Sequence, residues 1–164
     1  MAAKADTSLV DSRSASAFFN LVSKDNHLRL LYPIRNPLDC AVSNTISTHV
    51  RLLPGLNINS TKESALEAIL NEFLWFLEIE KEMPEKCLHF YAFEVDKAKF
   101  EQIANFLDID SNEEWTESAI RLWKIDQSKY EHNEGFKELY KKLVIKKFAS
   151  FPDEQIPLLK FIEM

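Results

Sequence analysis

Glycine is scarce in this 164-residue chain, which contains only Gly55 and Gly135. A loop that cradles phosphate between a strand and a helix needs glycine, because its backbone amides must approach the phosphate closely. Neither glycine lies at a predicted strand–helix junction. The sequence therefore contains no recognisable phosphate-binding loop of the P-loop type.

Cysteine is equally scarce, and long apolar runs are absent. Cys40 and Cys87 each lie in an apolar stretch without metal-ligand spacing, so we predict two reduced thiols and no metal site. No run approaches the roughly 20 apolar residues of a membrane helix. Residues 1–6 lack the apolar core of a signal peptide. We therefore expect a cytoplasmic protein with no membrane partner.

The charge balance is acidic, with 26 aspartate and glutamate residues against 20 lysine and arginine residues and a net charge of −6. Such a surface disfavours nucleic-acid partners, which require a positive field, but a local basic pocket for a small anion stays possible. The 46% of hydrophobic residues is enough for a sizeable core. We interpret residues 1–164 as a single domain.

The apolar pattern alternates between short runs and amphipathic stretches, which favours an α/β fold with a parallel sheet flanked by helices. Both predicted strands, Leu28–Ile34 and Cys87–Phe93, are short apolar runs bounded by turn residues. The predicted helices are Ser16–Val22, Pro37 to about Leu52, a long one opened by a Ser60–Glu63 capping box, one capped by Asp96, one from Ser111 to Trp123, one within 132–148, and an apolar stretch at 156–162.

One constellation joins the first strand to the helix that follows it. Asn36 and Pro37 are typical of a helix start, and Arg35 precedes them at the predicted C-terminal end of the strand. Ligands of open α/β sheets bind at this edge, and a helix N-terminus with an arginine suits a phosphate. Ser43 shares a helix face with Asn36. The alternative is a surface arginine beside an ordinary helix cap.

The segment from Arg35 to Ser43 reads R-N-P-L-D-C-A-V-S. It resembles the 3′-phosphate-binding element, R-[ND]-P-x-D-x-x-x-S, of sulfotransferases that use the donor 3′-phosphoadenosine-5′-phosphosulfate. Two further segments are similar to that family: Phe93-Glu94-Val95 stands where Tyr-Glu-Asp is common, and residues 106–109, Phe-Leu-Asp-Ile, stand where Phe-Leu-Gly-Ile is common. The similarity covers roughly residues 25–110.

The resemblance implies a P-loop NTPase-like sulfotransferase fold and a specific set of ligands. It implies that Arg35 and Ser43, with Asn36 beside them, bind the donor's 3′-phosphate, and that Phe93 lies near the adenine. It also implies transfer of a sulfuryl group to a hydroxyl or amine of a small-molecule or carbohydrate acceptor, without a metal. The acceptor and the oligomeric state are not defined by these residues.

Two elements of that family have no counterpart here: the N-terminal loop that holds the 5′-phosphosulfate, and a late Arg-Lys-Gly segment. The sequence is thus interpreted as a partial sulfotransferase-like domain: a truncated product, a fragment, or half of an enzyme whose second chain supplies the loop. The alternative is a non-catalytic nucleotide-binding or interaction protein derived from a sulfotransferase. A P-loop kinase relative is disfavoured because it needs the same loop. No catalytic base is identified.

The four histidines, His27, His49, His89 and His132, are scattered without metal-ligand spacing. We interpret each of them as structural or solvated. The three tryptophans, Trp75, Trp115 and Trp123, are interpreted as core residues rather than as stacking partners of a cofactor.

Overall fold

The computed structural model describes residues 24–25, 27–110, 112–123 and 130–164. The predicted helix at Ser16–Val22 lies outside these residues. Strand β1 (Leu30–Ile34) pairs in parallel with strand β2 (Cys87–Tyr91), with Leu30 opposite Cys87 and Ile34 opposite Tyr91. The prediction of two parallel strands in one sheet is confirmed. Both strands are two residues shorter than predicted.

The described chain is mixed α/β, with two parallel strands flanked by six α-helices. The helices and 3₁₀ turns are α3 (Pro37–Ile46), η1 (His49–Leu52), α4 (Lys62–Glu82), η2 (Ala92–Glu94), α5 (Lys97–Phe106), α6 (Glu113–Leu122), α7 (Glu134–Lys147) and α8 (Pro152–Lys160). Helices α3 and α4 form the crossover between β1 and β2, as parallel pairing requires. None of the helices in the described ranges is long and apolar enough to span a membrane.

The prediction that the first helix runs from Pro37 to Leu52 is wrong beyond Ile46. Near its end, the side chains of Thr45 and Ser47 donate hydrogen bonds to carbonyls one turn earlier, at 2.8 and 2.7 Å. Such bonds compete with regular helix geometry. Thr48 then adopts the left-handed conformation with φ of 61°, so the chain leaves the α-helix before η1 begins.

Two of the predicted helix caps are displaced by one residue. Thr61, rather than Ser60, caps α4 by accepting a hydrogen bond from the Ser64 amide at 3.3 Å. Asn112, rather than Ser111, caps α6 through the Trp115 amide at 2.9 Å. In both places two good capping residues are adjacent, so residue type alone does not choose between them. The predicted cap at Asp96 is confirmed.

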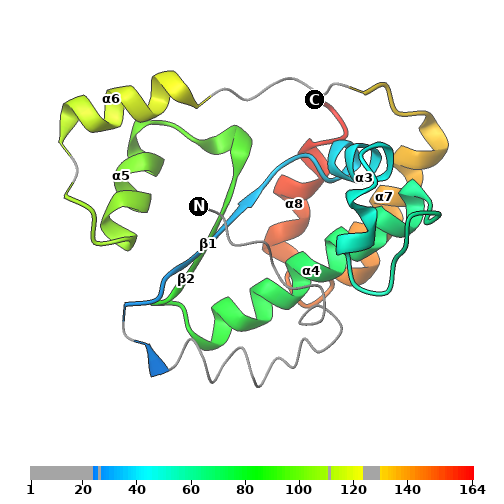
Figure 1. Ribbon diagram of the computed structural model, residues 1–164, viewed down its shortest axis with the longest axis horizontal. Coiled ribbons are helices and arrows are strands. Elements are labelled where there is room, and N and C mark those ends of the chain that lie inside the picture. The colour runs from blue at the N-terminus through cyan, green and yellow to red at the C-terminus, as the bar shows by residue number, and fades with distance from the viewer. Residues whose placement is uncertain (1–23, 26, 111, 124–129) are drawn as a thin grey trace.

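The helices separate onto the two sides of the sheet, as Figure 1 shows: α3, α4, α7 and α8 gather on one side and α5 with α6 on the other. Alternate strand residues face the larger group of helices. Tyr32 of β1 stacks on Phe76 of α4 with ring centroids 4.7 Å apart, and Tyr91 of β2 meets Phe161, just after α8, at 6.2 Å. The main core therefore lies on this face.

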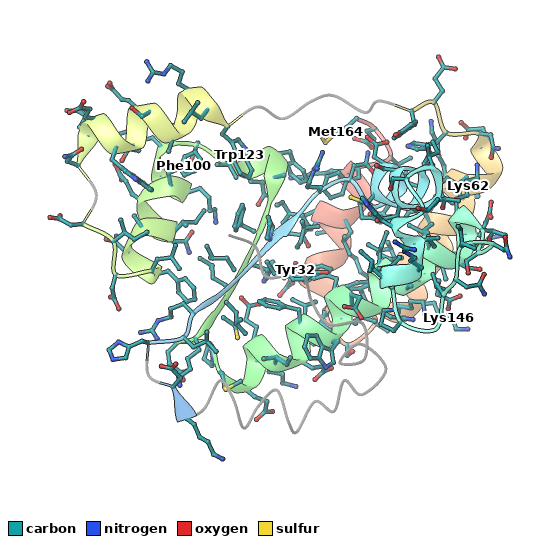
Figure 2. All side chains as sticks on the ribbon, viewed as in Figure 1. Tyr32, Lys62, Phe100, Trp123, Lys146 and Met164 are labelled. Atoms are coloured by element: carbon teal, nitrogen blue, oxygen red, sulfur yellow. The ribbon has the colours of Figure 1, made fainter. Side chains whose placement is uncertain are left out.

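Aromatic residues cover the other face. Trp123, at the end of α6, lies 6.1 Å from Phe90 of β2 and 5.8 Å from Phe100 of α5, centroid to centroid (Figure 2). Its indole N–H donates to the Ala92 carbonyl at 3.2 Å. The half-buried Trp123 thus packs on two aromatic rings and has its N–H satisfied, which agrees with its interpretation as a packing residue.

Candidate functional site

The turn that joins β1 to α3 has the helix start that the sequence predicts. The side-chain oxygen of Asn36 accepts a hydrogen bond from the Leu38 amide at 3.0 Å. Pro37 occupies the first helical position, and Asp39 lies in the first turn. Because proline fixes φ and the asparagine satisfies an amide, these residues start the helix at the C-terminal end of the strand. The turn lies at the sheet edge where ligands of α/β proteins bind.

Arg35 is the cation of this turn. Its side chain is exposed, and among the described residues it has no ion-pair or hydrogen-bond partner. It lines a pocket of about 200 Å³ between β1, α3 and α4, whose walls are mostly apolar. The remaining lining residues are Tyr32, Pro33, Ile34, Pro37, Cys40, Asn44, Ile69, Leu70 and Phe73. The guanidinium is therefore free to meet an anion from solvent.

The other predicted ligands take different positions around Arg35. Asn36 is next to it, but its side chain is engaged: the oxygen caps α3 and the Nδ2 group donates to the Phe161 carbonyl at 3.5 Å. Ser43 is exposed on the second turn of α3 and does not line the pocket, which is bordered on that helix by Pro37, Cys40 and Asn44. The structure thus brings Arg35 and Asn36 together in one turn.

Phe93 is placed away from the pocket. It belongs to η2, after β2, and its ring lies 5.0 Å from Phe161 and 5.6 Å from Tyr91. The Lys160 ammonium lies 5.5 Å from the centre of the ring. Phe161 therefore contacts two of the predicted residues, Asn36 through its carbonyl and Phe93 through its ring.

The sequence prediction missed a partner of the motif's aspartate. His132 Nε2 lies 2.7 Å from Asp39 Oδ1, and the histidine side chain is only 6% exposed. This pair joins the start of α3 to the residues just before α7. The two residues are 93 positions apart, so no local sequence pattern announces the contact.

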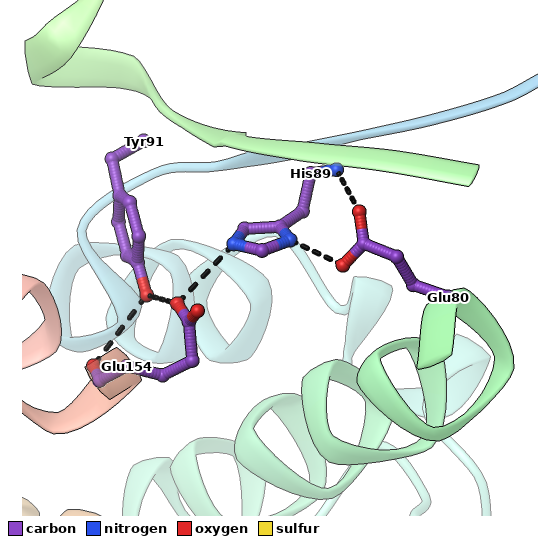
Figure 3. Close-up of polar contacts among 4 residues, drawn as sticks. All are labelled: Glu80, His89, Tyr91 and Glu154. Carbon is purple, nitrogen blue, oxygen red and sulfur yellow. Dashed lines mark hydrogen bonds and ion pairs between the residues drawn. The ribbon is translucent and has the colours of Figure 1, made fainter. Parts of the chain in front are cut away.

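A second polar cluster lies between the sheet and the helices α4 and α8 (Figure 3). His89 of β2 contacts Glu80 of α4 through Nδ1 at 2.5 Å and Glu154 of α8 through Nε2 at 3.2 Å. The Tyr91 hydroxyl donates to the same Glu154 oxygen at 2.5 Å. The histidine and both carboxylate side chains are less than 20% exposed. We refer to these four residues as the His89 cluster.

The ion pairs in the His89 cluster shift its ionisation. Burial lowers the pKa of His89, but hydrogen bonds and charge from Glu154 and Glu80 outweigh burial and raise it to about 9. Burial opposes ionisation of Glu154, yet the bonds from His89 and Tyr91 hold the pKa of that carboxyl below its usual value. Burial and the adjacent Glu154 raise the pKa of Tyr91. At neutral pH the cluster therefore contains an imidazolium, two carboxylates and a neutral phenol.

The His89 cluster occupies both ring nitrogens of the histidine, so the imidazole has no lone pair left for proton abstraction or metal binding. The interpretation of His89 as structural agrees with this geometry. Its signal in the sequence is the pair His89 and Tyr91, two residues apart on one face of an otherwise apolar strand. Glu80 and Glu154 meet opposite nitrogens of the ring, and in the described part of the chain no group of three His, Cys, Asp or Glu residues is arranged so that it could hold a metal ion.

The two cysteines are free thiols in the described chain. Burial raises the pKa of Cys40, while the charge of Arg35 opposes the shift. Burial also raises the pKa of Cys87, to about 11. Both thiols are therefore protonated at neutral pH and poorly reactive.

Comparison of the chain with known proteins gives no relative: no family model matches it, and no curated protein or solved structure is significantly similar to it.

Proposed function

We propose that this chain is a sulfotransferase-family protein whose Arg35 turn binds the 3′-phosphate of 3′-phosphoadenosine-5′-phosphosulfate or of the product adenosine 3′,5′-bisphosphate. The single observation that carries the proposal is the setting of Arg35. It is an exposed guanidinium without a partner among the described residues, beside a pocket at the C-terminal edge of a parallel strand. A fixed cation at that edge, beside a helix N-terminus, is suited to phosphate.

The turn after β1 offers few groups besides Arg35 that could bind a phosphate. The Leu38 amide is already bonded to the Asn36 side chain and the Cys40 amide to the Asn36 carbonyl, so neither of these two amides is available to a phosphate. The Asp39 carboxyl disfavours a second anion in this turn. Its Oδ1 lies 2.7 Å from His132 Nε2, so the side chain is kept at the start of α3. Arg35 is therefore the principal anchor, and Ser43 a secondary one.

A second observation favours the family resemblance. Asp108 stands where the family pattern has glycine, and its φ of 54° lies in the left-handed region that glycine adopts most readily. The residue lies directly after Leu107, the C-cap of α5, and the Ile109 amide donates to the Ala104 carbonyl at 2.9 Å. The backbone geometry that explains a glycine at this place is thus present, with aspartate tolerated.

We infer a P-loop NTPase-like sulfotransferase fold that lacks the unit holding the 5′-phosphosulfate within this sequence. Gly55 lies in the turn after η1 and Gly135 in α7, so neither serves a strand–helix junction. The donor, when bound, supplies the sulfuryl group; a second chain carrying the missing loop would complete the site. We place the protein in the cytoplasm, where its two free thiols stay reduced.

The alternative function is nucleotide binding or protein interaction without catalysis, which the position of the two glycines favours for the isolated chain. We expect no measurable sulfuryl transfer by this chain alone, because its sequence has no glycine-rich loop whose backbone amides would stabilise charge on the leaving phosphate. Incubation with labelled donor and a panel of phenols, alcohols, amines and sugars tests this. Turnover of about 1 s⁻¹ or more would contradict it.

Calorimetric titration tests the site itself. We expect tighter binding of adenosine 3′,5′-bisphosphate than of adenosine 5′-monophosphate, because only the former carries the 3′-phosphate. Arg35→Ala should weaken bisphosphate binding at least ~10-fold, since charge-assisted hydrogen bonds contribute about 1.5–3 kcal/mol each. Arg35→Lys should restore it only in part, because lysine lacks the planar fork. Ser43→Ala should cost less.

Arg51 provides the matched control. It is another exposed arginine, on η1 at the far end of α3, so Arg51→Ala removes the same charge away from the turn. We expect this variant to bind like the parent. Equal affinities for the two nucleotides, or equal losses in the Arg35 and Arg51 variants, would reduce the Arg35 turn to a helix cap beside a surface cation.

A further inference from the structure

Among the described residues, several polar contacts hold helix α8 against the rest of the structure. At its first turn, Glu154 accepts hydrogen bonds from His89 and Tyr91 of β2. Near its end, the Leu158 carbonyl accepts from the Tyr140 hydroxyl of α7 at 2.7 Å. This second contact joins two helices that are adjacent in sequence, and Gln155 of α8 also donates to the carbonyl of Phe148, the C-cap of α7, at 2.9 Å. Lys160 lies 4.0 Å from Glu94 of η2. Of these contacts, only those of Glu154 are made with a strand of the sheet.

The charged groups that face His89 are one carboxylate from α4 and one from α8, Glu80 and Glu154. Its other neighbours are uncharged: the Tyr91 phenol of β2, and the Phe73 ring of α4 at 5.6 Å. An imidazolium donates from both nitrogens and so satisfies both carboxylates at once. A neutral imidazole donates from one nitrogen only, so loss of the proton forces one carboxylate to give up its hydrogen bond.

The geometry decides which carboxylate loses its bond. Glu80 contacts Nδ1 at 2.5 Å, and its second oxygen accepts the backbone N–H of His89 at 3.0 Å, so it is held twice. Glu154 contacts Nε2 at the longer distance of 3.2 Å. The neutral tautomer that keeps its proton on Nδ1 therefore retains Glu80. In this tautomer Nε2 carries a lone pair that faces the Glu154 carboxylate, so the two groups repel each other.

One residue, Phe161, links α8 to the turn that contains Arg35. Phe161 follows α8 directly, and its carbonyl accepts the Nδ2 hydrogen bond of Asn36, the cap of α3. Its ring packs on Tyr91 and Phe93. A shift of α8 therefore withdraws a support from the turn that starts α3.

We propose that the His89 imidazolium is a lock that seats α8 on the sheet, and that loss of its proton releases α8 together with the Phe161 carbonyl that supports Asn36. The lock is a property of the fold and does not depend on nucleotide binding. It connects the buried cluster to the exposed turn through a single helix.

The ionisation of the cluster is consistent with this lock. The pKa of His89 is raised to about 9, so its proton stabilises the seated helix fully below its ordinary value of 6.5, and this stabilisation is lost as pH rises through about 9. Burial raises the pKa of Tyr91, and that of Cys87 to about 11. Neither nearby group therefore titrates in the same range.

Hydrogen exchange followed by mass spectrometry tests the lock on the full chain. Protection factors, corrected for the pH dependence of intrinsic exchange, are compared between residues 152–162 and the core of α4. Between pH 7 and pH 10 we expect protection in α8 to fall at least ~10-fold while α4 keeps its protection. In His89→Gln, protection of α8 should already be low at pH 7 and show no step near pH 9.

Tyr91→Phe serves as the second variant, because it keeps the His89–Glu154 contact and removes only the phenol donor. It should retain the step near pH 9 from a somewhat lower starting protection. The proposal is overturned if α8 protection in the parent shows no step. It is also overturned if α8 and α4 lose protection together. Should His89→Gln fail to fold, the parent profile and Tyr91→Phe decide the question.

Discussion

Two polar regions of the molecule, the His89 cluster and the turn after β1, differ in whether their cation is paired with carboxylates or exposed to solvent. In the His89 cluster, an imidazolium lies between Glu80 and Glu154, and all three side chains are less than 20% exposed. In the turn after β1, the Arg35 guanidinium is exposed and has no partner among the described residues. The His89 charge is enclosed by side chains of β2, α4 and α8, whereas the Arg35 charge is solvated.

The difference separates charges that serve the fold from charges available to a ligand. A buried charge must be paired, since taking an ion out of water is costly, and its partners then leave no free hydrogen-bonding capacity. An exposed cation at a sheet edge is stabilised by solvent and keeps all five N–H donors. Substitutions in the two regions should therefore change different measurements.

The largest expected effect is on stability, from His89→Gln. Removing the cation leaves two carboxylates largely buried and facing one uncharged amide, so we expect the free energy of unfolding to fall by about 3 kcal/mol. Urea denaturation at pH 7 followed by circular dichroism measures the change. The matched control is Lys97→Gln, which breaks an ion pair of 3.1 Å with Glu113 between exposed side chains. The control should unfold at the parent's midpoint.

If His89→Gln and Lys97→Gln had equal small effects, the cluster would contribute no more than a surface pair. That result would contradict the conclusion that the buried cation of the His89 cluster stabilises the fold more than an exposed cation does.

The next effect is a pH dependence that belongs to His89. The native state binds the histidine proton with a pKa of about 9, against 6.5 ordinarily, so stability must fall with pH between those values. From pH 7 to pH 10 we expect the parent to lose about 2 kcal/mol more than His89→Gln, because the variant has no proton to lose there. Parallel stability curves for the two proteins would contradict the assignment.

Much of the sheet and of the helix that follows it could be predicted from the sequence. Strands β1 and β2 are short apolar runs, and the start of α3 at Pro37 is encoded locally by Asn36 and Pro37. The end of α3 was not predictable, because the apolar positions near Leu52 continue the helical pattern. The left-handed Thr48 interrupts it, and a threonine gives no local signal for that conformation.

The candidate site divides in the same way. The motif places Arg35 and Ser43 by local spacing, and their role as phosphate ligands stays a prediction. The pairings of Asp39 with His132 and of His89 with Glu154 depend on how α7, which begins just after His132, and α8 dock on the earlier part of the chain. Periodicity indicates that such helices form, but not which of their polar residues meets which strand.

A smaller change is expected from Tyr91→Phe. The phenol donates to Glu154 at 2.5 Å, but the carboxylate keeps its contact with His89, and the ring keeps its packing on Phe161. We expect a loss of about 1 kcal/mol, typical of one hydrogen bond. The double variant with His89→Gln should lose less than the sum of the two single losses, because both bonds depend on the same Glu154 oxygen. Strict additivity would show that the two contacts act independently.

The smallest effect on stability is expected at the other region, from Arg35→Ala. The side chain is exposed, and its cation precedes the N-terminus of α3, where the helix dipole disfavours positive charge. The free energy of unfolding should therefore stay within about 0.5 kcal/mol of the parent or rise slightly. Asn36→Ala is the control in the same turn. It removes the cap on the Leu38 amide and should cost about 1 kcal/mol. If Arg35→Ala leaves the stability unchanged and lowers bisphosphate affinity at least ~10-fold, the role of Arg35 is to bind the ligand. A loss of stability beyond that of Asn36→Ala would instead make Arg35 part of the fold and end the contrast with His89.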